Sequence, residues 1–284
     1  MGSNFKFLSK YLKISVMGMV LMFIMMACVD SEFDYELEYA GDRIVILGYI
    51  NNEGNTHLLI KKSLHPQNPN GDDLIINATV DLYEDNVMLT SLTELDSGRF
   101  FLPLGMPLTP GRSYHVYATA PNLPDAWSRP QVLPNIVCFD TVYYAPFEIE
   151  PYKFLSKFCI SDPVDVQNYY YTKRKSFLNG VESTGFNAYY DAIPYSNIIT
   201  EDLIQQGSTY CGIEGLYPYS TTDSVAIELL NLTRDMYEFG LSYDQYDFTR
   251  GDAFLNIMPI YSNIENGYGF FGIYSSCWDG YPVP

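Results

Sequence analysis

The chain has 284 residues, of which 47% are hydrophobic and 18% are charged, a balance that is typical of globular proteins and excludes a disordered polymer. Asp and Glu number 34 against 16 Lys and Arg, and the formal net charge of −18 argues against nucleic acid as a partner, because an acidic surface repels phosphate groups. His occurs only 3 times, so the side chain most used for general-base catalysis and metal binding is scarce.

Residues 1–27 have the layout of a secretory signal peptide. Lys6, Lys10 and Lys13 precede the charge-free, mostly apolar stretch 14–27. As a helix these fourteen residues would span about 21 Å, less than the roughly 30 Å of a bilayer core. We therefore expect cleavage rather than a permanent transmembrane helix.

The signal peptide ends at Ala27, directly before Cys28. This junction resembles the lipobox of bacterial lipoproteins, in which a small residue precedes a cysteine that is diacylated and becomes the mature N-terminus. The resemblance implies that Cys28 carries acyl chains such as palmitate and anchors the protein in a membrane. The alternative is a buried or free cysteine near a signal peptide.

Residues 28–42 are expected to form an acidic tether. Acidic residues occupy every second position from Asp30 to Glu38, alternating with uncharged, mostly apolar or aromatic residues. Like charges on one face of a strand repel each other, which favours an extended solvated chain over a strand. The stretch also resembles the export signal of Bacteroidota lipoproteins, which implies an outer-membrane location facing the cell exterior.

Short strands separated by turns begin at Arg43. Apolar runs or period-two alternation occur at 44–50, 57–61, 78–83 and 113–118, with turn residues between them and no helical stretch. This pattern predicts an antiparallel, immunoglobulin-like β-sandwich over residues 43–120.

A proline-rich linker over residues 121–135 is expected to separate this sandwich from a second domain, because its four prolines each lack a backbone donor. Residues 136–284 are predicted to form a second β-rich domain with one helix near 234–247, capped at its N-terminus by Thr233. The fold class is thus mainly β. Further strands are expected at the segments 137–145, 154–160, 168–173, 225–232, 254–259 and 268–276.

Several segments, in this order, resemble the DUF4249 family of Bacteroidota lipoproteins. They are residues 45–50, 78–83, 111–114, 162–163, 168–170, 262–267 and 269–272. The resemblance covers nearly the whole mature chain and implies an outer-membrane lipoprotein of the kind encoded beside TonB-dependent transporters, with no catalytic residues to carry over. Independently of the family, the glycines in 267–272 predict a strand that another backbone approaches closely.

No motif of a well-marked enzyme class is present, and we expect neither catalytic residues nor a cofactor. His57, His65 and His115 lack the spacing of a zinc site, so no metal site is expected. Residues 68–73 offer oxygen atoms but not the spacing of an EF-hand, which favours a solvated turn. Asp162, Asp191 and Asp223 are formal candidates for a glycosidase pair, but 34 acidic residues make chance pairs inevitable.

The four cysteines that remain after Cys28 lie in the predicted second domain. They allow three disulfide connectivities, and the sequence also permits them to be buried hydrophobic residues. These cysteines are Cys138, Cys159, Cys211 and Cys277.

Tyrosines cluster in the same domain, at 143–144, 169–171, 189–190, 217 and 219. Tyr suits glycan or peptide recognition, whereas the alternative is that these rings line the edges of a sandwich. Taken together, the observations favour a non-catalytic accessory lipoprotein that assists nutrient capture by a TonB-dependent transporter. The alternatives are a structural protein of cell-surface assembly and, less favoured, a glycan hydrolase.

Overall fold

The computed structural model describes residues 41–65, 68, 73–96, 98–103, 105–147, 150–164, 166–182, 198–199, 207–216, 224–249 and 258–282. The lipidation candidate Cys28, the signal peptide and the tether up to residue 40 lie outside these residues. The described part is mainly β with one helix, α2 (Arg234–Thr249), as predicted. The strands are β1 (Ile44–Asn51), β2 (Thr56–Lys62), β3 (Thr79–Glu84), β4 (Val87–Ser91), β5 (Thr93–Asp96), β6 (Arg99–Phe101), β7 (Ser113–Thr119), β8 (Ala126–Ser128), β9 (Gln131–Val132), β10 (Thr141–Phe147), β11 (Glu150–Ser161), β12 (Tyr169–Leu178), β13 (Val181–Glu182), β14 (Ile198–Ile199), β15 (Thr209–Leu216), β16 (Ser224–Leu232), β17 (Ile264–Glu265) and β18 (Tyr268–Pro282).

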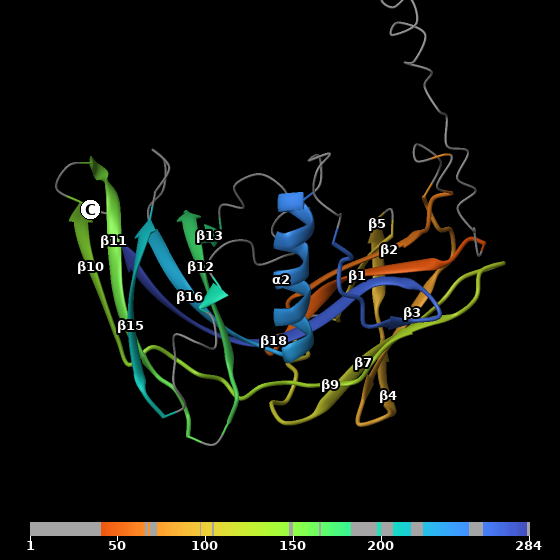
Figure 1. Cartoon of the computed structure of the whole chain (residues 1–284), viewed down its shortest axis with the longest axis horizontal. Helices are drawn as coiled ribbons and strands as arrows, with labels where there is room; N and C mark the ends of the chain where they lie inside the picture. Colours follow the sequence, from red (N-terminus) through yellow and green to blue (C-terminus); the bar gives the residue numbers. More distant parts are fainter. Residues whose placement is uncertain are drawn as a thin grey trace, which may run out of the picture. The chain divides into compact units, whose positions relative to one another are not determined.

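The described strands form three sheets. A nine-stranded sheet has the order β13-β12-β16-β18-β1-β2-β6-β5, with β14 paired to β12. A six-stranded sheet has the order β17-β8-β7-β3-β4, with β9 paired to β7, and a three-stranded sheet has the order β10-β11-β15. The long strand β18 joins the halves of the largest sheet, since it pairs with β1 along its first part and with β16 along the rest (Figure 1).

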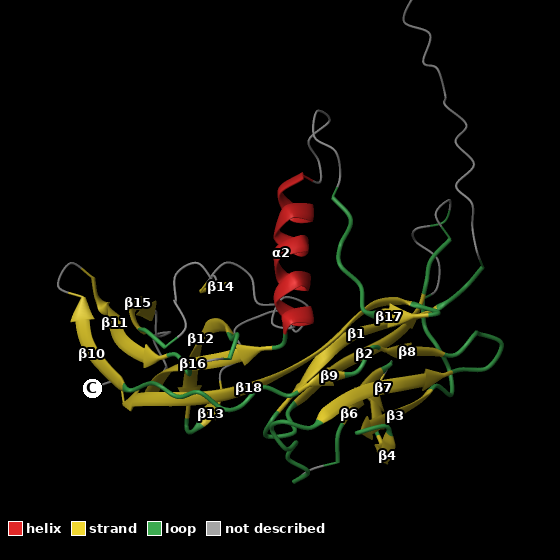
Figure 2. Ribbon diagram, turned by 60° about the horizontal axis from the view of Figure 1, so that its bottom comes forward, coloured by secondary structure: helices red, strands yellow, loops and turns green. Residues whose placement is uncertain are grey.

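Part of the nine-stranded sheet and the six-stranded sheet pack face to face as a sandwich (Figure 2). Alternation along β7 puts Tyr114, Val116 and Ala118 inside and leaves the residues between them half-buried on the outer face. The inner side chains pack against Ile44 and Ile46 of β1 in one hydrophobic cluster. The predicted sandwich strands are therefore confirmed, with ends shifted by only one or two residues.

A departure from the expected antiparallel pattern is the pairing of β1 with β18, which is parallel. Parallel strands require cover on both faces. The sandwich core covers one face, and α2 covers the other, where Phe239 stacks on Phe270 with 4.1 Å between ring centroids. The helix and its cap at Thr233 were both predicted, and the backbone N–H of Met236 donates to Thr233 Oγ1 at 3.4 Å.

Close backbone approach explains Gly269 in the 267–272 segment and its counterpart Gly48 on β1. Gly269 has φ +104°, and a Cβ atom there would lie 2.0 Å from the carbonyl oxygen of Ile46 on β1. Gly48 of β1 has φ +149°, and its Cβ would lie 1.7 Å from the carbonyl oxygen of His57 on β2. Only glycine fits these positions without moving the backbone.

Strands of the predicted second domain continue the same sheet that contains β1 and β2 of the sandwich. The domain boundaries themselves stay a prediction. Within the proposed linker 121–135, β8 and β9 form short ladders with β7, so the prolines shorten the strands without preventing them. Of the strand expected at 254–259, residues 254–257 lie outside the described part, and Met258 and Pro259 are not in a strand.

Candidate functional site

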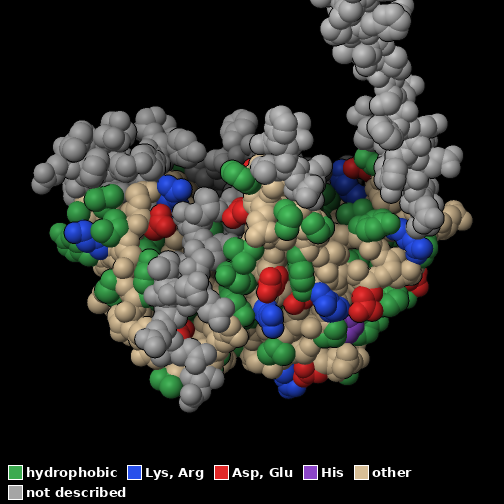
Figure 3. Space-filling model, viewed as in Figure 1, with side chains coloured by type: hydrophobic (Ala, Val, Ile, Leu, Met, Phe, Trp, Pro, Cys, Tyr) green, Lys and Arg blue, Asp and Glu red, His purple; other side chains and the backbone are tan. Residues whose placement is uncertain are grey.

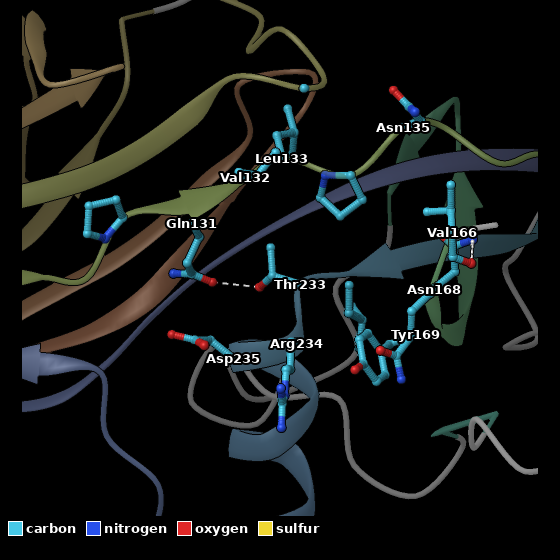
Figure 4. Close-up of a pocket in the computed structure, with 15 residues that line it drawn as sticks. Gln131, Val132, Leu133, Asn135, Val166, Asn168, Tyr169, Thr233, Arg234 and Asp235 are labelled. Carbon is cyan, nitrogen blue, oxygen red and sulfur yellow. Dashed lines mark hydrogen bonds between the residues drawn. The ribbon is translucent and has the colours of Figure 1, made fainter.

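A pocket of about 440 Å³ lies at the N-terminal end of α2 (Figure 4). Four chain segments line it: Gly111 before β7, residues 130–135 with β9, residues 166–169 up to the start of β12, and the junction between β16 and α2. Its lining residues are Gly111, Pro130, Gln131, Val132, Leu133, Pro134, Asn135, Val166, Gln167, Asn168, Tyr169, Leu232, Thr233, Arg234 and Asp235.

Gln131 connects the sandwich to the start of the helix. The Thr233 hydroxyl donates to Gln131 Oε1 at 2.6 Å, and Gln131 Nε2 donates to the carbonyl oxygen of Phe271 in β18 at 2.7 Å. Both side chains are buried, and Figure 4 shows Gln131 and Thr233 pointing toward each other. These bonds fix the helix start relative to β9 and β18.

A second network supports the opposite wall of the pocket. Asn231 Nδ2 donates to Asn168 Oδ1 at 2.9 Å and to the carbonyl oxygen of Asn135 at 3.1 Å. Asn168 Nδ2 in turn donates to Asp162 Oδ1 at 3.1 Å, which also accepts the Tyr170 hydroxyl at 2.6 Å. Burial, together with the Asp162 carboxylate, raises the pKa of Tyr170, so the phenol stays protonated and keeps donating.

The charged groups at the helix start are also held. Asn263 Nδ2 donates to Asp235 Oδ2 at 3.1 Å, and Arg129 lies 3.9 Å from the same oxygen. Arg129 donates to the Tyr261 hydroxyl at 2.6 Å, while burial raises the pKa of Tyr261 to about 12. Arg234 is 75% exposed and pairs with Glu238 one turn further along the helix.

This arrangement suits binding of a small polar ligand more than chemistry on it. The pocket presents amides, a hydroxyl, one tyrosine ring, one arginine and one aspartate, and the networks hold most of its polar side chains in place. Preorganised walls lower the entropic cost of binding. We therefore take the pocket as the candidate binding site.

His57 and His115, two of the histidines considered for metal binding, lie in different sheets. His57 of β2 contacts the Tyr49 ring and His115 of β7 stacks on Tyr83. Among the described residues, no three His, Cys, Asp or Glu side chains are grouped so as to hold a metal ion.

Two further sets of candidates are only partly described. In the 68–73 turn, Asp73 pairs with Lys61 at 2.6 Å, and residues 69–72 lie outside the described part. Asp162 belongs to the pocket network, whereas Asp191 and Asp223 also lie outside.

The structure resolves the question that the sequence left open about the cysteines. Cys138 is bonded to Cys277, which joins the segment before β10 to β18. Cys159 is bonded to Cys211 across the neighbouring strands β11 and β15. Both disulfides lie in the predicted second domain, and the alternative of buried free cysteines is wrong.

The tyrosines of the predicted clusters differ in burial and position. Tyr170 and Tyr169 are buried, and Tyr169 lines the pocket while its ring stacks on Tyr237 at 4.6 Å. Tyr143 is 65% exposed on the three-stranded sheet. The tyrosines at 189, 190, 217 and 219 lie outside the described residues.

Comparison with protein-family models places residues 30–277 in a family described as a domain of unknown function, DUF4249. The chain belongs to the DUF4249 family. A comparison with curated proteins returned no match. In this DUF4249 protein, no helix of the described part is both long and apolar enough to cross a membrane.

The structure gives the C-terminal DUF4249 segment a physical role beside the pocket. Asn263 accepts from the backbone N–H of Phe271 at 3.0 Å and donates to its carbonyl oxygen at 2.7 Å, which ties the segment before β17 to β18. The same side chain reaches Asp235 of α2. Residues 262–272 thereby join the sandwich to the helix start.

Sequence reasoning missed Gln131 and Asn135 as pocket residues because they fall in the segment predicted to be a linker. Asn168 was noticed only as part of the family resemblance, and Thr233 only as a helix cap. Within the proline-rich segment, Gln131 is followed by the apolar Val132 and Leu133. Leu133, which is buried, was the available signal that the segment packs against other elements, whereas Val132 is exposed.

Proposed function

We propose that this protein is a lipid-anchored, non-catalytic accessory lipoprotein of the bacterial outer membrane, facing the cell exterior, that assists nutrient capture by a TonB-dependent transporter. The main support for this proposal is the disulfide pairing of four of the five cysteines. Four of them pair with one another, which leaves Cys28, at the end of the signal-like segment, available for acylation.

The two disulfides support an exported protein. Disulfides persist in oxidising compartments and are rare in the cytosol. A signal-like N-terminus directly before Cys28 agrees with export followed by lipidation. Membership of the DUF4249 family, whose members are expected to be encoded beside such transporters, supports the transporter partnership.

The rigid pocket supports a binding role. Its walls come from Gln131, Asn168 and Thr233, whose side chains are already oriented by hydrogen bonds. In this proposal the pocket and the tyrosine-rich segments of residues 136–284 contact the ligand or the transporter, while Cys28 holds the protein at the membrane.

The anchor is tested by metabolic labelling with a palmitate analogue. The parent protein should take up label, and Cys28→Ser should not. The double variant Cys159→Ser/Cys211→Ser is the matched control, because it loses two cysteines but keeps Cys28 and should remain labelled. Label retained in the Cys28→Ser protein would exclude Cys28 as the anchor.

The partnership is tested by purifying the protein from membranes under mild detergent. A transporter-sized partner should be retained by the parent protein. Absence of any such partner would refute the transporter role and leave the structural alternative, a protein of cell-surface assembly. A glycan and peptide array separates these two functions further, because an assembly protein should bind nothing on it.

A further inference from the structure

The outer face of the six-stranded sheet carries aromatic side chains where a solvent-facing sheet usually carries polar ones. Tyr83 of β3, His115 and Tyr117 of β7 and Trp127 of β8 all lie on this face, half-buried. We call these four residues the aromatic face. None of the four belongs to the hydrophobic core of the sandwich, because the residues that alternate with them point inward and fill that core.

The aromatic face consists of two cross-strand pairs of rings. Tyr83 lies opposite His115 in register, and their rings stack with centroids 4.8 Å apart and planes 13° apart. Tyr117 lies opposite Trp127, with centroids 6.1 Å apart and planes 17° apart. Since His115 and Tyr117 are two residues apart on β7, the two pairs lie side by side on one face, roughly 7 Å apart along the strand.

Carboxylates fix the polar edges of these rings. The Tyr117 hydroxyl donates to Asp125 Oδ2 at 2.5 Å, and the Trp127 indole N–H donates to Glu265 Oε2 at 3.0 Å. Next to Tyr117, Asp81 accepts from the Ser91 hydroxyl at 2.6 Å. Each carboxylate is thus oriented by an uncharged donor and retains further lone pairs for other donors.

The charge of this sheet restricts what can bind. None of the six strands β3, β4, β7, β8, β9 and β17 contains Lys or Arg. Burial lowers the pKa of His115, so its imidazole is uncharged at neutral pH. On the surface drawn in Figure 3, the basic side chains of the described residues likewise lie scattered rather than gathered into a patch.

We propose that the aromatic face binds a neutral oligosaccharide. Sugar hydroxyls are donors that match the acceptor-only carboxylates, and the apolar faces of sugar rings match aromatic side chains. Strands that carry carboxylates and neither Lys nor Arg disfavour phosphorylated, sulfated or carboxylated ligands, and the arginines beside β7 and β8 are paired, Arg112 with Asp85 and Arg129 with Asp235. A second copy of the chain does not fit, because it would bring Asp81, Asp125 and Glu265 against their like-charged equivalents.

This site is distinct from the pocket at α2. The inference rests on the proposed function in that it supplies a ligand class for nutrient capture. Its test, however, needs only the purified protein and no transporter.

The chain's two tryptophans provide the test. Trp127 belongs to the aromatic face, while Trp278 of β18 is 53% exposed elsewhere, near Phe177. Trp278→Phe leaves Trp127 as the only indole, and Trp127→Phe leaves Trp278 as the matched control. Each mature protein, purified in mild detergent, is titrated with neutral hexasaccharides of glucose, mannose, xylose and galactose while its indole fluorescence is recorded.

A saturable fluorescence change is expected in the Trp278→Phe protein with at least one of these sugars and not in the Trp127→Phe protein. Trp127→Ala should weaken binding about tenfold or more, and Glu265→Gln about tenfold, since each loses one stacking or hydrogen-bonding contact. Circular dichroism and thermal unfolding of each variant check that the fold is kept.

Three results would overturn the proposal: no saturable response of Trp127 to any of the four sugars, an equal response of Trp278, or a response restricted to cationic chitosan oligomers or basic peptides. Failure here is distinguishable from failure of the transporter role. Co-purification of a transporter does not depend on Trp127, so Trp127→Ala should still retain the partner.

Discussion

The sandwich region, made of β1–β9 with β17, and the second region, made of β10–β16, keep their folds in different ways. In the sandwich region one large hydrophobic cluster extends between two sheets. In the second region the described core divides into smaller clusters, and both disulfides have at least one cysteine there or directly before β10. A region with less buried apolar surface has less hydrophobic stabilisation, and covalent links offset the difference.

The strand β18 belongs to both regions, and it is held by hydrophobic packing in one and by a disulfide in the other. Its first part, including Phe271 and Ile273, is buried in the sandwich core. Its later part carries Cys277, which lies opposite Leu229 of β16 and is bonded to Cys138. Variants of each region can test whether packing stabilises one and cross-links the other.

The largest effect is expected from removing a disulfide in the second region. Cys138 and Cys277 are 139 residues apart, and loop-closure entropy for such a link amounts to about 5 kcal/mol. The 52-residue link between Cys159 and Cys211 amounts to about 4 kcal/mol. In urea unfolding, Cys138→Ala/Cys277→Ala should therefore lose more stability than Cys159→Ala/Cys211→Ala. An equal or reversed order would show that local strain or packing, rather than loop length, sets the contribution of these links.

The stability of the sandwich region should instead depend on the close approach of the β1 and β18 backbones. Gly269→Ala combines a left-handed backbone with a Cβ atom 2.0 Å from the Ile46 carbonyl oxygen, so we expect the free energy of unfolding to fall by about 3 kcal/mol or more. Gly111→Ala is the matched control, because Gly111 also has a positive φ of +83° but no atom within 4 Å of the new Cβ. Its cost should be about 1 kcal/mol. Similar losses in both variants would mean that φ, and not the approach of β1 to β18, decides the cost.

The same comparison explains how much of the fold the sequence could predict. In the sandwich region, strands such as β3 and β7 alternate strictly because one face is buried and the other is not, and their positions were predicted closely. Near-continuous apolar runs such as β1 and β16 were recognised as strands, and the hairpin of β1 with β2 is confirmed, but the pairing of β1 and β16 with β18 was not predicted. Parallel pairing of β1 with β18 joins residues more than two hundred positions apart, and no local pattern specifies such a register.

The candidate site was harder to predict than the fold. Gln131, Asn168 and Thr233 meet only after three distant segments pack together, and each has an ordinary local role in the sequence. The disulfide pairing had the same difficulty, since four cysteines give three connectivities and spacing favours none. The helix and its cap were predictable because Thr233 and the spacing of Met236 and Phe239 are local signals.

A smaller effect is expected at the contact between the two regions. Thr233→Val keeps the shape of the side chain but removes the N-cap of α2 and the hydrogen bond to Gln131, which should lower the free energy of unfolding by about 2 kcal/mol. Thr233→Ser keeps the hydroxyl and should lose less than half as much. If Thr233→Val loses no more stability than Thr233→Ser, the hydroxyl contributes no more than the methyl group, and the hydrogen bonds of Thr233 do not support the pocket as we infer.

The smallest effect is a pH dependence that both regions share. Burial, with a hydrogen bond from its hydroxyl to Glu84, raises the pKa of Tyr114 in the sandwich region to about 12 from its ordinary value of 10.0. The unfolded chain loses this proton near pH 10 while the folded chain keeps it, so the free energy of unfolding should fall as the pH rises from about 10 to about 12. Tyr114→Phe should reduce the slope of that decline, because the titrating group is gone, although the variant is less stable at pH 7 through loss of the bonds to Glu84 and Thr109.

Tyr170→Phe is the counterpart in the second region, where burial beside Asp162 also raises the pKa of the phenol. Urea unfolding at pH 8, 10 and 11 measures both slopes, and an unchanged slope in the Tyr114 variant would show that its phenol does not titrate with unfolding.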